Sequence, residues 1–400
     1  MGQTRLSELH RRRLLQGSAA LGLSGLSACA GLPSPGPGAG TPLAPLRARP
    51  DRLFDVTVCL RPFRAAGPRL DTEQIGDALV VHNYGHGGSG WSLSWGSSTI
   101  AVQKALAGGA RDIAVLGCGA LGLTSATLAQ RAGARVTIYA RDLLPQTRSA
   151  RATGSWTPDS RIALASAAGP AFGDLWEQMA RTSFKTYRQY LGLPGRPVEW
   201  TDRYYVYDET PEPEPAAQPG ALDFGSYRDR IADLTPRAQR LAPGESPFQA
   251  PRVERSTELM FNIADYGHTL MSDFLLAGGR VVRREFHHPS EFATLPEKVV
   301  INCPGYAARE LWGDTSVVPV RGQIGWLIPQ AEVNYGVVYH GVLMLARRDG
   351  VVIQDFSGGD MQGYGDTDET PRRADSERAV AIVAELYAKH WAAGGRRSSV

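Results

Sequence analysis

Residues 113–139 read IAVLGCGALGLTSATLAQRAGARVTIY, and this stretch decides the fold. It opens with a short apolar strand, continues through a glycine-rich turn into a helical segment, and returns after Gly133 to a second strand. Its first glycines stand at Gly117, Gly119 and Gly122, in the Gly-x-Gly-x-x-Gly spacing. A strand, this spacing, a helix and a second strand together predict a Rossmann-like dinucleotide-binding unit in an α/β protein.

Each glycine of this motif has its own physical task. Gly117 permits the tight turn, Gly119 lets the backbone approach a pyrophosphate, and Gly122 allows the helix to pack closely on the strand. The phosphate would lie at the helix N-terminus, where free N–H groups and the helix dipole favour an anion.

The end of the second strand should carry an acidic residue that binds the ribose hydroxyls. Here Tyr139-Ala140 is followed by Arg141 and then by Asp142. Asp142 fits a ribose partner, whereas Arg141 fits a phosphorylated ribose and therefore NADP. These local residues leave both alternatives open.

Composition limits the class of protein and of partner. The chain has 400 residues, a formal net charge of +3, 42% hydrophobic and 21% charged residues, which excludes collagen-like, disordered and coiled-coil classes. The length suggests about two domains. Residues 1–29 hold four arginines and one glutamate, so they carry the whole +3 and the remainder is neutral. We therefore expect no nucleic-acid partner.

The first 29 residues resemble an export signal. Residues 11–15 read RRRLL, like a twin-arginine signal, and residues 26–29 read LSAC, like a bacterial lipobox. The apolar stretch between them suits a signal peptide and is shorter than the roughly 18–20 residues of a membrane-spanning helix. We expect residues 1–29 to be a signal peptide with a lipobox and residues 30–52 to be a Pro/Gly-rich tether. The protein would be exported to the cell envelope or periplasm as a lipoprotein anchored only through Cys29.

Three further cysteines, Cys59, Cys118 and Cys303, each lie in an apolar run. Their odd number argues against obligatory pairing, so we expect buried thiols. No Cys or His pair has ligand spacing, and we expect no metal.

Other stretches identify a family resemblance. They read LRPFR at 60–64, VHNYGHGGSGW at 81–91, ATGSW at 152–156, NCPGYA at 302–307 and VPVRGQI at 318–324. Together with the glycine motif they resemble the D-amino-acid oxidase family of FAD-dependent enzymes, over nearly all of the chain after the tether. The resemblance implies FAD as the cofactor.

The order of these stretches differs from that family. There the dinucleotide strand begins the protein and the Arg-Pro and HNYGHGG segments end it, whereas here residues 54–106 precede the dinucleotide strand. The resemblance therefore implies a circularly permuted chain, with its new ends between a C-terminal helix at about 375–391 and a strand at 56–61.

The resemblance also implies an α/β architecture for residues 53–400, with a Rossmann-like FAD-binding domain and a mixed-sheet α+β substrate domain. The FAD-binding parts are expected at about 76–165, 298–325 and 350–391, and the substrate-domain parts at about 53–70, 166–297 and 326–349. Apolar spacing predicts helices over 93–106, 172–191 and 263–279. A strand at 281–282 would follow the last helix and belong to the substrate domain.

Three residues are expected at the substrate. By motif position, Arg61 would clamp the carboxylate, because a guanidinium donates two parallel hydrogen bonds. The carbonyl of Gly88 would accept from the substrate amine, and Tyr339 would lie beside the substrate, with Tyr335 as a competitor.

The remaining candidates would contact the cofactor. The helix after Gly88 would direct its N-terminal N–H groups at the flavin C2 carbonyl and stabilise the reduced anion. The cofactor-binding candidates are Gly117, Gly119, Gly122, Asp142, Ser149, Thr153, Gly154, Ser155, Ser89, Gly90, Trp91 and Ser92.

Three residues depart from the family pattern. Leu343 stands where the family usually has a second tyrosine, which makes the pocket more apolar. Pro304 replaces a threonine and removes a backbone N–H donor. Arg141 replaces the usual acidic ribose partner.

The function that the resemblance implies is oxidative deamination of a D-amino acid. Hydride would pass from Cα to flavin N5, oxygen would reoxidise the flavin to give hydrogen peroxide, and the products would be a 2-oxo acid and ammonia. The alternatives are another amine or glycine oxidase of the same superfamily, a non-catalytic flavin-binding or flavin-free envelope lipoprotein, and an NADP dehydrogenase. The partners would be the amino acid and oxygen, and a homodimer is left open.

Overall fold

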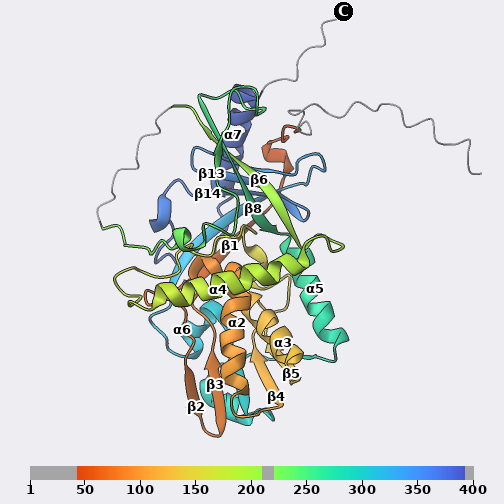
Figure 1. The fold of residues 1–400 in the computed structure, drawn as a ribbon, viewed down its shortest axis with the longest axis vertical. Helices are drawn as coiled ribbons and strands as arrows, with labels where there is room; N and C mark the ends of the chain where they lie inside the picture. The colour runs from red at the N-terminus through yellow and green to blue at the C-terminus, as the bar shows by residue number, and fades with distance from the viewer. Residues whose placement is uncertain (1–42, 210–219, 392–400) are drawn as a thin grey trace, which may run out of the picture. The chain divides into compact units, whose positions relative to one another are not determined.

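The computed structural model describes residues 43–209 and 220–391. The predicted signal peptide, and the tether as far as residue 42, lie outside these ranges. Within them, no helix has both the length and the apolar composition needed to cross a membrane. The described residues from Ala44 onward form one compact unit. Its described part contains two β-sheets and the helices packed on them, which confirms the predicted α/β class (Figure 1).

The first sheet has the order β2-β3-β10-β4-β5-β9. Its strands are β2 (Thr72–Ile75), β3 (Ala78–His82), β4 (Asp112–Leu116), β5 (Arg135–Ala140), β9 (Arg280–Arg283) and β10 (Val299–Asn302). All of them run parallel except β2. Because the carboxyl ends of parallel strands share one edge, the segments after β3, β4, β5 and β10 meet there.

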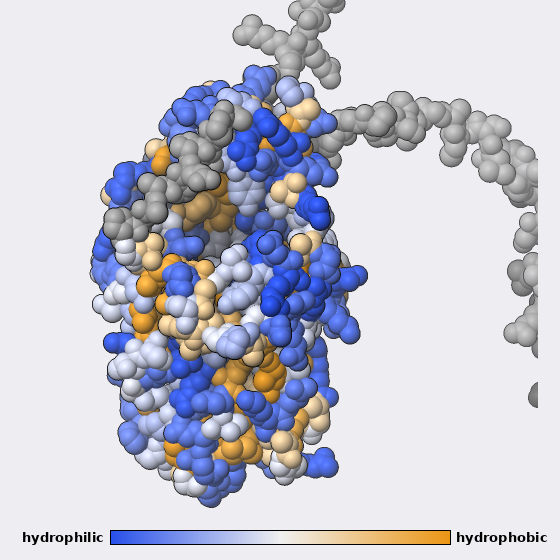
Figure 2. Space-filling view, turned by 60° about the vertical axis from the view of Figure 1, so that its left-hand side comes forward, coloured by the Kyte–Doolittle hydropathy of each residue, from blue (hydrophilic) through white to orange (hydrophobic). Residues whose placement is uncertain are grey.

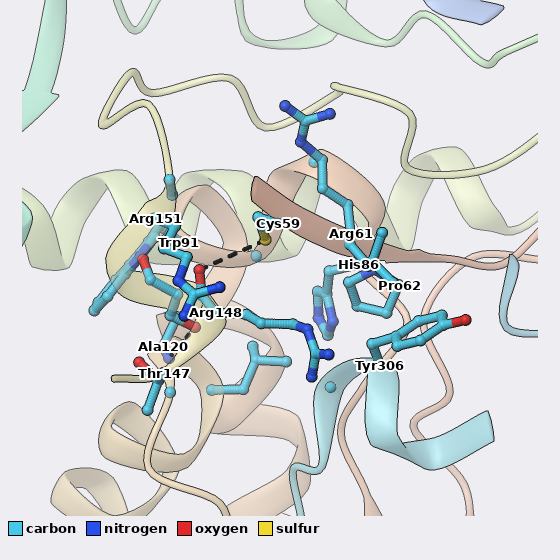
Figure 3. Close-up of a pocket in the computed structure, with 18 of the residues that line it drawn as sticks. Cys59, Arg61, Pro62, His86, Trp91, Ala120, Thr147, Arg148, Arg151 and Tyr306 are labelled. Carbon is cyan, nitrogen blue, oxygen red and sulfur yellow. Dashed lines mark hydrogen bonds between the residues drawn. The ribbon is translucent and has the colours of Figure 1, made fainter. Parts of the chain in front are cut away.

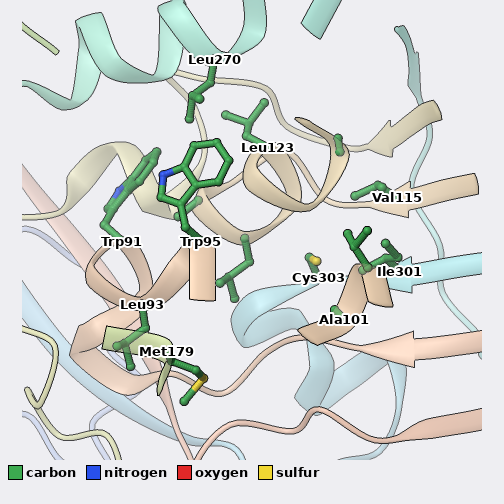
Figure 4. Packing of buried hydrophobic residues seen from close by; sticks show 14 of the residues in the cluster. Trp91, Leu93, Trp95, Ala101, Val115, Leu123, Met179, Leu270, Ile301 and Cys303 are labelled. Carbon is green, nitrogen blue, oxygen red and sulfur yellow. The ribbon is translucent and has the colours of Figure 1, made fainter. Parts of the chain in front are cut away.

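Helices cover this sheet and enclose the main core. They are α2 (Gly90–Leu106), α3 (Ala120–Arg131), α4 (Phe172–Tyr187) and α5 (Ile263–Leu276). α2 packs against α3 and α4, and α3 packs against β5 and α5. Figure 4 shows Trp91, Trp95, Leu123 and Leu270 gathered between these helices. The apolar faces of α2 and α3 thus bury one side of the sheet, and α4 and α5 pack on these two helices.

The second sheet has the order β1-β11-β14-β13-β12-β6-β8-β7. Its strands are β1 (Leu53–Phe63), β6 (Val198–Tyr207), β7 (Gln239–Arg240), β8 (Arg252–Phe261), β11 (Val318–Leu327), β12 (Gly336–Tyr339), β13 (Val342–Arg347) and β14 (Gly350–Asp355). Only β12 and β6 pair in parallel; the other pairs are antiparallel. The sheet is therefore mixed, as expected for the substrate domain.

Two further helices complete the fold. α6 (Ala308–Leu311) follows β10, and α7 (Arg373–His390) packs against β11, β13 and β14. The face of the molecule in Figure 2 is mostly hydrophilic, with apolar areas between the hydrophilic ones. Such interspersion is usual for a surface in contact with water.

The end of the predicted tether is not free. Leu46 and Ala48 are buried. The Gln330 side chain accepts a hydrogen bond from the Arg47 N–H at 3.0 Å and donates to the Pro45 carbonyl at 3.0 Å. Two apolar side chains and paired backbone groups hold residues 44–48 against the segment that follows β11, so this part of the tether prediction is wrong.

The predicted helices are present as α2, α4 and α5, with ends shifted by a few residues. The predicted domain boundaries differ from the sheets at three places. β9 pairs in parallel with β5 in the first sheet, because the α5–β9 segment forms one more crossover of that sheet. β11 and β14, which were mostly expected in the FAD-binding domain, pair with each other in the second sheet. α7, which was also expected in the FAD-binding domain, packs against both strands.

Candidate active site

A cavity of about 610 Å³ lies between the two sheets. The first sheet contributes the segments after β3, β4, β5 and β10, and the second contributes residues of β1, β13 and β14. A cavity at the carboxyl edge of a parallel sheet is the usual place for a ligand in such folds.

The glycine turn after β4 has the tight geometry expected of it. Gly117 has φ +96°, and a Cβ on it would lie 2.4 Å from the Cys303 carbonyl oxygen. A Cβ on Gly122 would lie 2.0 Å from the Gly117 carbonyl oxygen. One glycine is required for the turn and the other for the contact of α3 with β4. Gly117 lines the cavity, whereas Gly122 lies behind it.

The N-terminus of α3 opens into the cavity beside polar side chains. The Ala120 N–H donates to the Ser149 hydroxyl at 3.0 Å, and a Cβ on Gly119 would lie 2.6 Å from the same oxygen. Thr147 Oγ1 and Arg148 Nε are buried without a hydrogen-bond partner among the described residues. In Figure 3 Arg148 extends from this end of the cavity toward Tyr306. Two orphaned buried polar atoms at a helix N-terminus fit an anionic group such as a pyrophosphate.

The end of β5 carries the residues that discriminate between ribose types. Arg141 Nε donates to Asp142 Oδ2 at 2.9 Å, and Arg141 Nη1 donates to Glu285 Oε1 at 3.0 Å. All three residues line the cavity. Two carboxylates neutralise the one guanidinium, so this end is not arranged for a phosphorylated ribose. Glu285 follows β9 and was not among the sequence candidates.

The HNYGHGG segment leads into α2 and packs under a neighbouring turn. The Gly88 N–H donates to the Ser160 carbonyl at 3.0 Å, and a Cβ on Gly88 would lie 2.5 Å from Ser160 Oγ. The hydroxyl of Ser89 donates to the carbonyls of Thr157 and Ser160, and that of Ser92 accepts from the Thr157 N–H. The two serine side chains therefore hold the 157–160 loop in place. Gly88 and Ser92 line the cavity, whereas Ser89 does not.

Gly90 and Trp91, at the first turn of α2, also line the cavity. The Trp91 indole N–H donates to the Ser149 carbonyl at 2.8 Å. That bond joins the start of α2 to the residue that caps α3, so the two helix N-termini are held beside the same space (Figure 3).

Residues 153–155 form another part of the cavity wall. The Thr153 hydroxyl donates to Gln354 Oε1 at 2.6 Å. Gly154 has φ +90°, and a Cβ there would lie 2.6 Å from the Phe261 carbonyl. Ser155 Oγ accepts from Arg203 at 2.7 Å. These bonds hold all three predicted residues at the cavity.

Arg61 is a cation of the second-sheet wall without a partner among the described residues. It lies on β1, lines the cavity and is partly buried. None of the described residues forms a hydrogen bond or ion pair with its guanidinium. Burial lowers the pKa of Arg61, and the neighbouring Cys59 partly offsets this effect. A guanidinium without a carboxylate partner in a partly dry cavity is suited to bind a carboxylate from a ligand.

The structure does not bring Tyr339 to the cavity. Tyr339 is buried on β12, and its hydroxyl donates to Asp208 Oδ2 at 3.0 Å. Successive residues of a strand face opposite sides, and Tyr339 pairs with Val342 while Val338 pairs with Leu343. Leu343 lines the cavity, so Tyr339 faces away from it. Tyr335 is also outside; its hydroxyl bonds the Ala44 carbonyl at 2.7 Å.

Burial keeps His86 and the three thiols of the cavity uncharged at neutral pH. Burial lowers the pKa of His86 to about 3, and neither ring nitrogen has a partner among the described residues. Burial raises the pKa of Cys118 to about 11 and that of Cys303 to about 12. Cys59 is also a free thiol, with its pKa raised by burial. In the described part of the chain no group of His, Cys, Asp and Glu has the arrangement of a metal site.

Together these features fit flavin adenine dinucleotide. Ser149 and Arg148 stand at one helix N-terminus, Asp142 and Glu285 at the strand end, and Gly88 at the second helix. The cavity also contains charged residues that sequence reasoning missed, among them Arg148, Arg161, Arg203 and Glu285. Only Glu285 had a sequence signal, as an acidic residue following a short strand.

Comparisons with known proteins agree with these features. A family model described as FAD dependent oxidoreductase (DAO) matches residues 112–397. A D-amino-acid oxidase of Streptomyces coelicolor is 27% identical over 305 residues, 72% of this chain and 80% of that protein. A D-amino-acid oxidase of Dictyostelium discoideum is 24% identical over 289 residues, 70% and 75% of the two chains. The solved glycine oxidase from Geobacillus kaustophilus has a TM-score of 0.45 and 12% identity, covering 70% of this chain and 80% of its own.

Proposed function

The chain belongs to the FAD dependent oxidoreductase family, which confirms FAD as its cofactor, and we propose that it oxidatively deaminates a D-amino acid. The reaction consumes the amino acid, oxygen and water, and yields a 2-oxo acid, ammonia and hydrogen peroxide. The observation that carries the proposal is the unpaired guanidinium of Arg61, which opens on the same cavity as Gly88 and the 153–155 loop.

The residues of this chain act by positioning. Arg61 binds the α-carboxylate through two parallel hydrogen bonds, and the Gly88 carbonyl accepts from the amine. Those two contacts fix the carbon that bears the reacting hydrogen, and orientation of this kind lowers the barrier without a strong general base. FAD, when bound, supplies a hydride acceptor that oxygen reoxidises. The first turn of α2 lines the cavity, and its N–H groups would stabilise negative charge on the ring system of a bound flavin.

Anaerobic titration of the purified holoenzyme tests this function. A panel of D-amino acids, their L-enantiomers and glycine is added, and bleaching of the flavin absorbance is followed. We expect bleaching by at least one D-amino acid and none by its enantiomer. Bleaching by glycine alone would favour a glycine oxidase, and bleaching by L-amino acids alone would overturn the proposal. Purified protein that neither carries nor takes up flavin would identify a non-catalytic lipoprotein.

Arg61→Ala makes the test specific to the site. Loss of the clamp should raise KM for every amino acid while flavin content stays intact, because Arg61 is assigned to substrate rather than cofactor. Arg61→Lys keeps the positive charge but cannot donate two parallel hydrogen bonds to a carboxylate. Its substrate affinity should therefore lie between those of Arg61→Ala and the wild type. Unchanged KM in Arg61→Ala would remove Arg61 from the site.

We also propose that the chain order is a circular permutation of the family order. The family match begins at residue 112, the first residue of β4, although the HNYGHGG segment precedes it. The two ends of the described unit lie close together, since the Tyr335 hydroxyl bonds both the Ala44 carbonyl at 2.7 Å and the Tyr387 hydroxyl near the end of α7 at 2.9 Å. A chain reopened between α2 and β4, with α7 linked to β1, should fold and bind FAD. Failure of that chain to fold while the natural order folds would count against the permutation.

We propose separately that residues 1–29 are an export signal that ends at a lipid-modified cysteine, Cys29. Its support is the order of the RRRLL and LSAC runs in residues 1–29. Labelling of growing cells with a fatty-acid probe should mark the full chain, and Cys29→Ala should lose the label and leave the membrane fraction. An unlabelled protein in the envelope would refute the anchor.

A further inference from the structure

A second arginine, Arg161, lines the same cavity as Arg61. Its side chain is 12% exposed, and its backbone has φ +48°. A Cβ on Gly87 would lie 1.9 Å from the Arg161 carbonyl oxygen, so the turn that carries Arg161 lies directly on the HNYGHGG segment. Since the neighbouring Ser160 carbonyl accepts from the Gly88 N–H, the backbone of Arg161 is fixed beside the glycine whose carbonyl is expected to accept from the substrate amine.

Arg161 has mainly uncharged partners. Nε donates to the Asp360 carbonyl at 2.7 Å, and Nη2 donates to the Gly359 carbonyl at 2.9 Å. The nearest carboxylate is Asp360 Oδ1 at 3.8 Å, on a side chain that is 73% exposed. A carboxylate at that distance and exposure neutralises little of the charge.

Of the five other arginines that line the cavity, all but Arg151, which donates to the Val58 carbonyl at 3.0 Å, have a carboxylate partner. Arg203 pairs with the buried Glu258 at 3.1 Å, and Arg148 pairs with Glu369 at 2.5 Å. Arg141 is held between two carboxylates. Arg61 and Arg161 therefore give the substrate end an excess of positive charge. Burial lowers the pKa of Arg161, and the charge of Arg61 lowers it further, so the two cations repel each other across a poorly solvated space.

We propose that the substrate carries a second carboxylate: Arg61 binds the α-carboxylate, Arg161 binds the carboxylate of the side chain, and the enzyme prefers acidic D-amino acids. This inference rests on the proposed function and names its substrate class. A dicarboxylate places one negative charge against each guanidinium and removes the repulsion between them. The uncharged walls formed by Leu343 and Phe356 leave the two arginines as the groups that select for charge.

Matched acid and amide substrates test the inference, because they share size and differ in charge. The holoenzyme is assayed with D-aspartate against D-asparagine and with D-glutamate against D-glutamine. For whichever of the two acids is the better substrate, we expect kcat/KM to exceed that of its amide by at least about tenfold. This is the effect of one charge-assisted hydrogen bond. Arg161→Gln should remove that preference, and Arg161→Lys should keep part of it. The control Arg135→Gln removes an exposed arginine at the opposite edge of the sheet, paired with Asp112, and should keep the full preference.

A binding measurement avoids dependence on turnover. Succinate and butyrate are both four-carbon acids, and only succinate carries two carboxylates. Succinate should perturb the flavin spectrum and raise Tm at lower concentration than butyrate, and this difference should vanish in Arg161→Gln. If no D-amino acid reduces the flavin, the proposed function fails. If D-alanine or D-valine reduces it while acids show no advantage and Arg161→Gln changes all substrates equally, this inference alone is overturned.

Discussion

Gly322 makes room for the guanidinium of Arg61. A Cβ on Gly322 would lie 2.2 Å from Arg61 Nη2 and 2.5 Å from Cζ. Gly322 lies on β11, where it pairs with Cys59 of β1, two residues before Arg61. The absence of one side chain on a neighbouring strand therefore lets the arginine lie flat against the sheet and reach the cavity.

We predict that Gly322→Ala weakens substrate binding without removing flavin. The added methyl group must displace the guanidinium, and overpacking of this kind typically costs about 1–3 kcal/mol. If most of that cost falls on the orientation of Arg61, KM should rise by about tenfold or more. Steady-state kinetics with the best substrate and the flavin absorbance ratio measure the two effects separately.

Gly108→Ala is the matched control, because a Cβ at Gly108 would meet nothing within 4 Å. It should leave KM unchanged. A Gly322→Ala variant with wild-type KM would show that Arg61 has enough freedom to act from another position.

A second prediction concerns Gly122, which is at the helix–strand contact rather than at the cavity. A Cβ there would lie 2.0 Å from the Gly117 carbonyl oxygen, so Gly122→Ala must push α3 away from β4. The N-terminus of α3 would then lose its alignment with Ser149. We expect the variant to be purified with much less flavin and a lower Tm, measured by absorbance and thermal unfolding. Full flavin occupancy would mean that the contact is not needed for the cofactor site.

Sequence reasoning predicted the fold where the signal was local. The strand–turn–helix–strand pattern around Gly117 and the apolar spacing of α4 and α5 both depend on neighbouring residues. The sheet to which a strand belongs depends on contacts that are distant in the sequence. β9 has four residues, two of them valines, and its sequence alone does not show whether it pairs with β5 or with the second sheet. The same holds for residues 44–48, whose contacts come from Gln330, almost three hundred residues later.

The candidate site was predicted best where a backbone motif fixes the geometry. The glycine turn, Gly88, Ser149, the 153–155 loop and Arg61 all line the cavity. Tyr339 was misplaced because a shift of one residue in strand register reverses the face on which a side chain lies. Arg161 could not be predicted, since its position depends on the packing of its turn on Gly87.

A third prediction concerns the ribose end of the cavity. Asp142 and Glu285 together neutralise Arg141. The double variant Asp142→Asn, Glu285→Gln leaves the guanidinium uncompensated and removes both acceptors for ribose hydroxyls. Each lost hydrogen bond costs about 0.5–1.5 kcal/mol, so FAD affinity should fall about tenfold, measured by titrating the apoprotein with FAD. Glu377→Gln, on the exposed surface of α7, should have no effect. Equal affinity in the double variant would place the ribose elsewhere.

The last prediction concerns Asp208, which joins the second sheet to α7. It accepts from Tyr339 and His340 at 3.0 and 2.9 Å, and Lys389 Nζ lies 2.9 Å from it. Burial alone would raise the pKa of Asp208, but hydrogen bonds from Lys389, His390 and Tyr339 outweigh it and hold the pKa well below its usual range. A carboxyl whose pKa is lowered by folding stabilises the native state above its unfolded pKa and loses that effect as the pH falls toward its folded pKa.

At pH 7, therefore, Asp208→Asn should be less stable than the wild type by about 1–2 kcal/mol, and the difference should begin to narrow below about pH 4, near the unfolded pKa of an aspartate. Tyr339→Phe removes one of the hydrogen bonds and should lower Tm while kcat and KM stay unchanged, because Tyr339 faces away from the cavity. Thermal unfolding of both variants between pH 7 and pH 3, with kinetics at pH 7, measures these effects. A stability difference independent of pH would show that the hydrogen bonds do not depend on the charge of Asp208. A kcat reduced by Tyr339→Phe at unchanged Tm would return Tyr339 to the catalytic role that its motif position suggested.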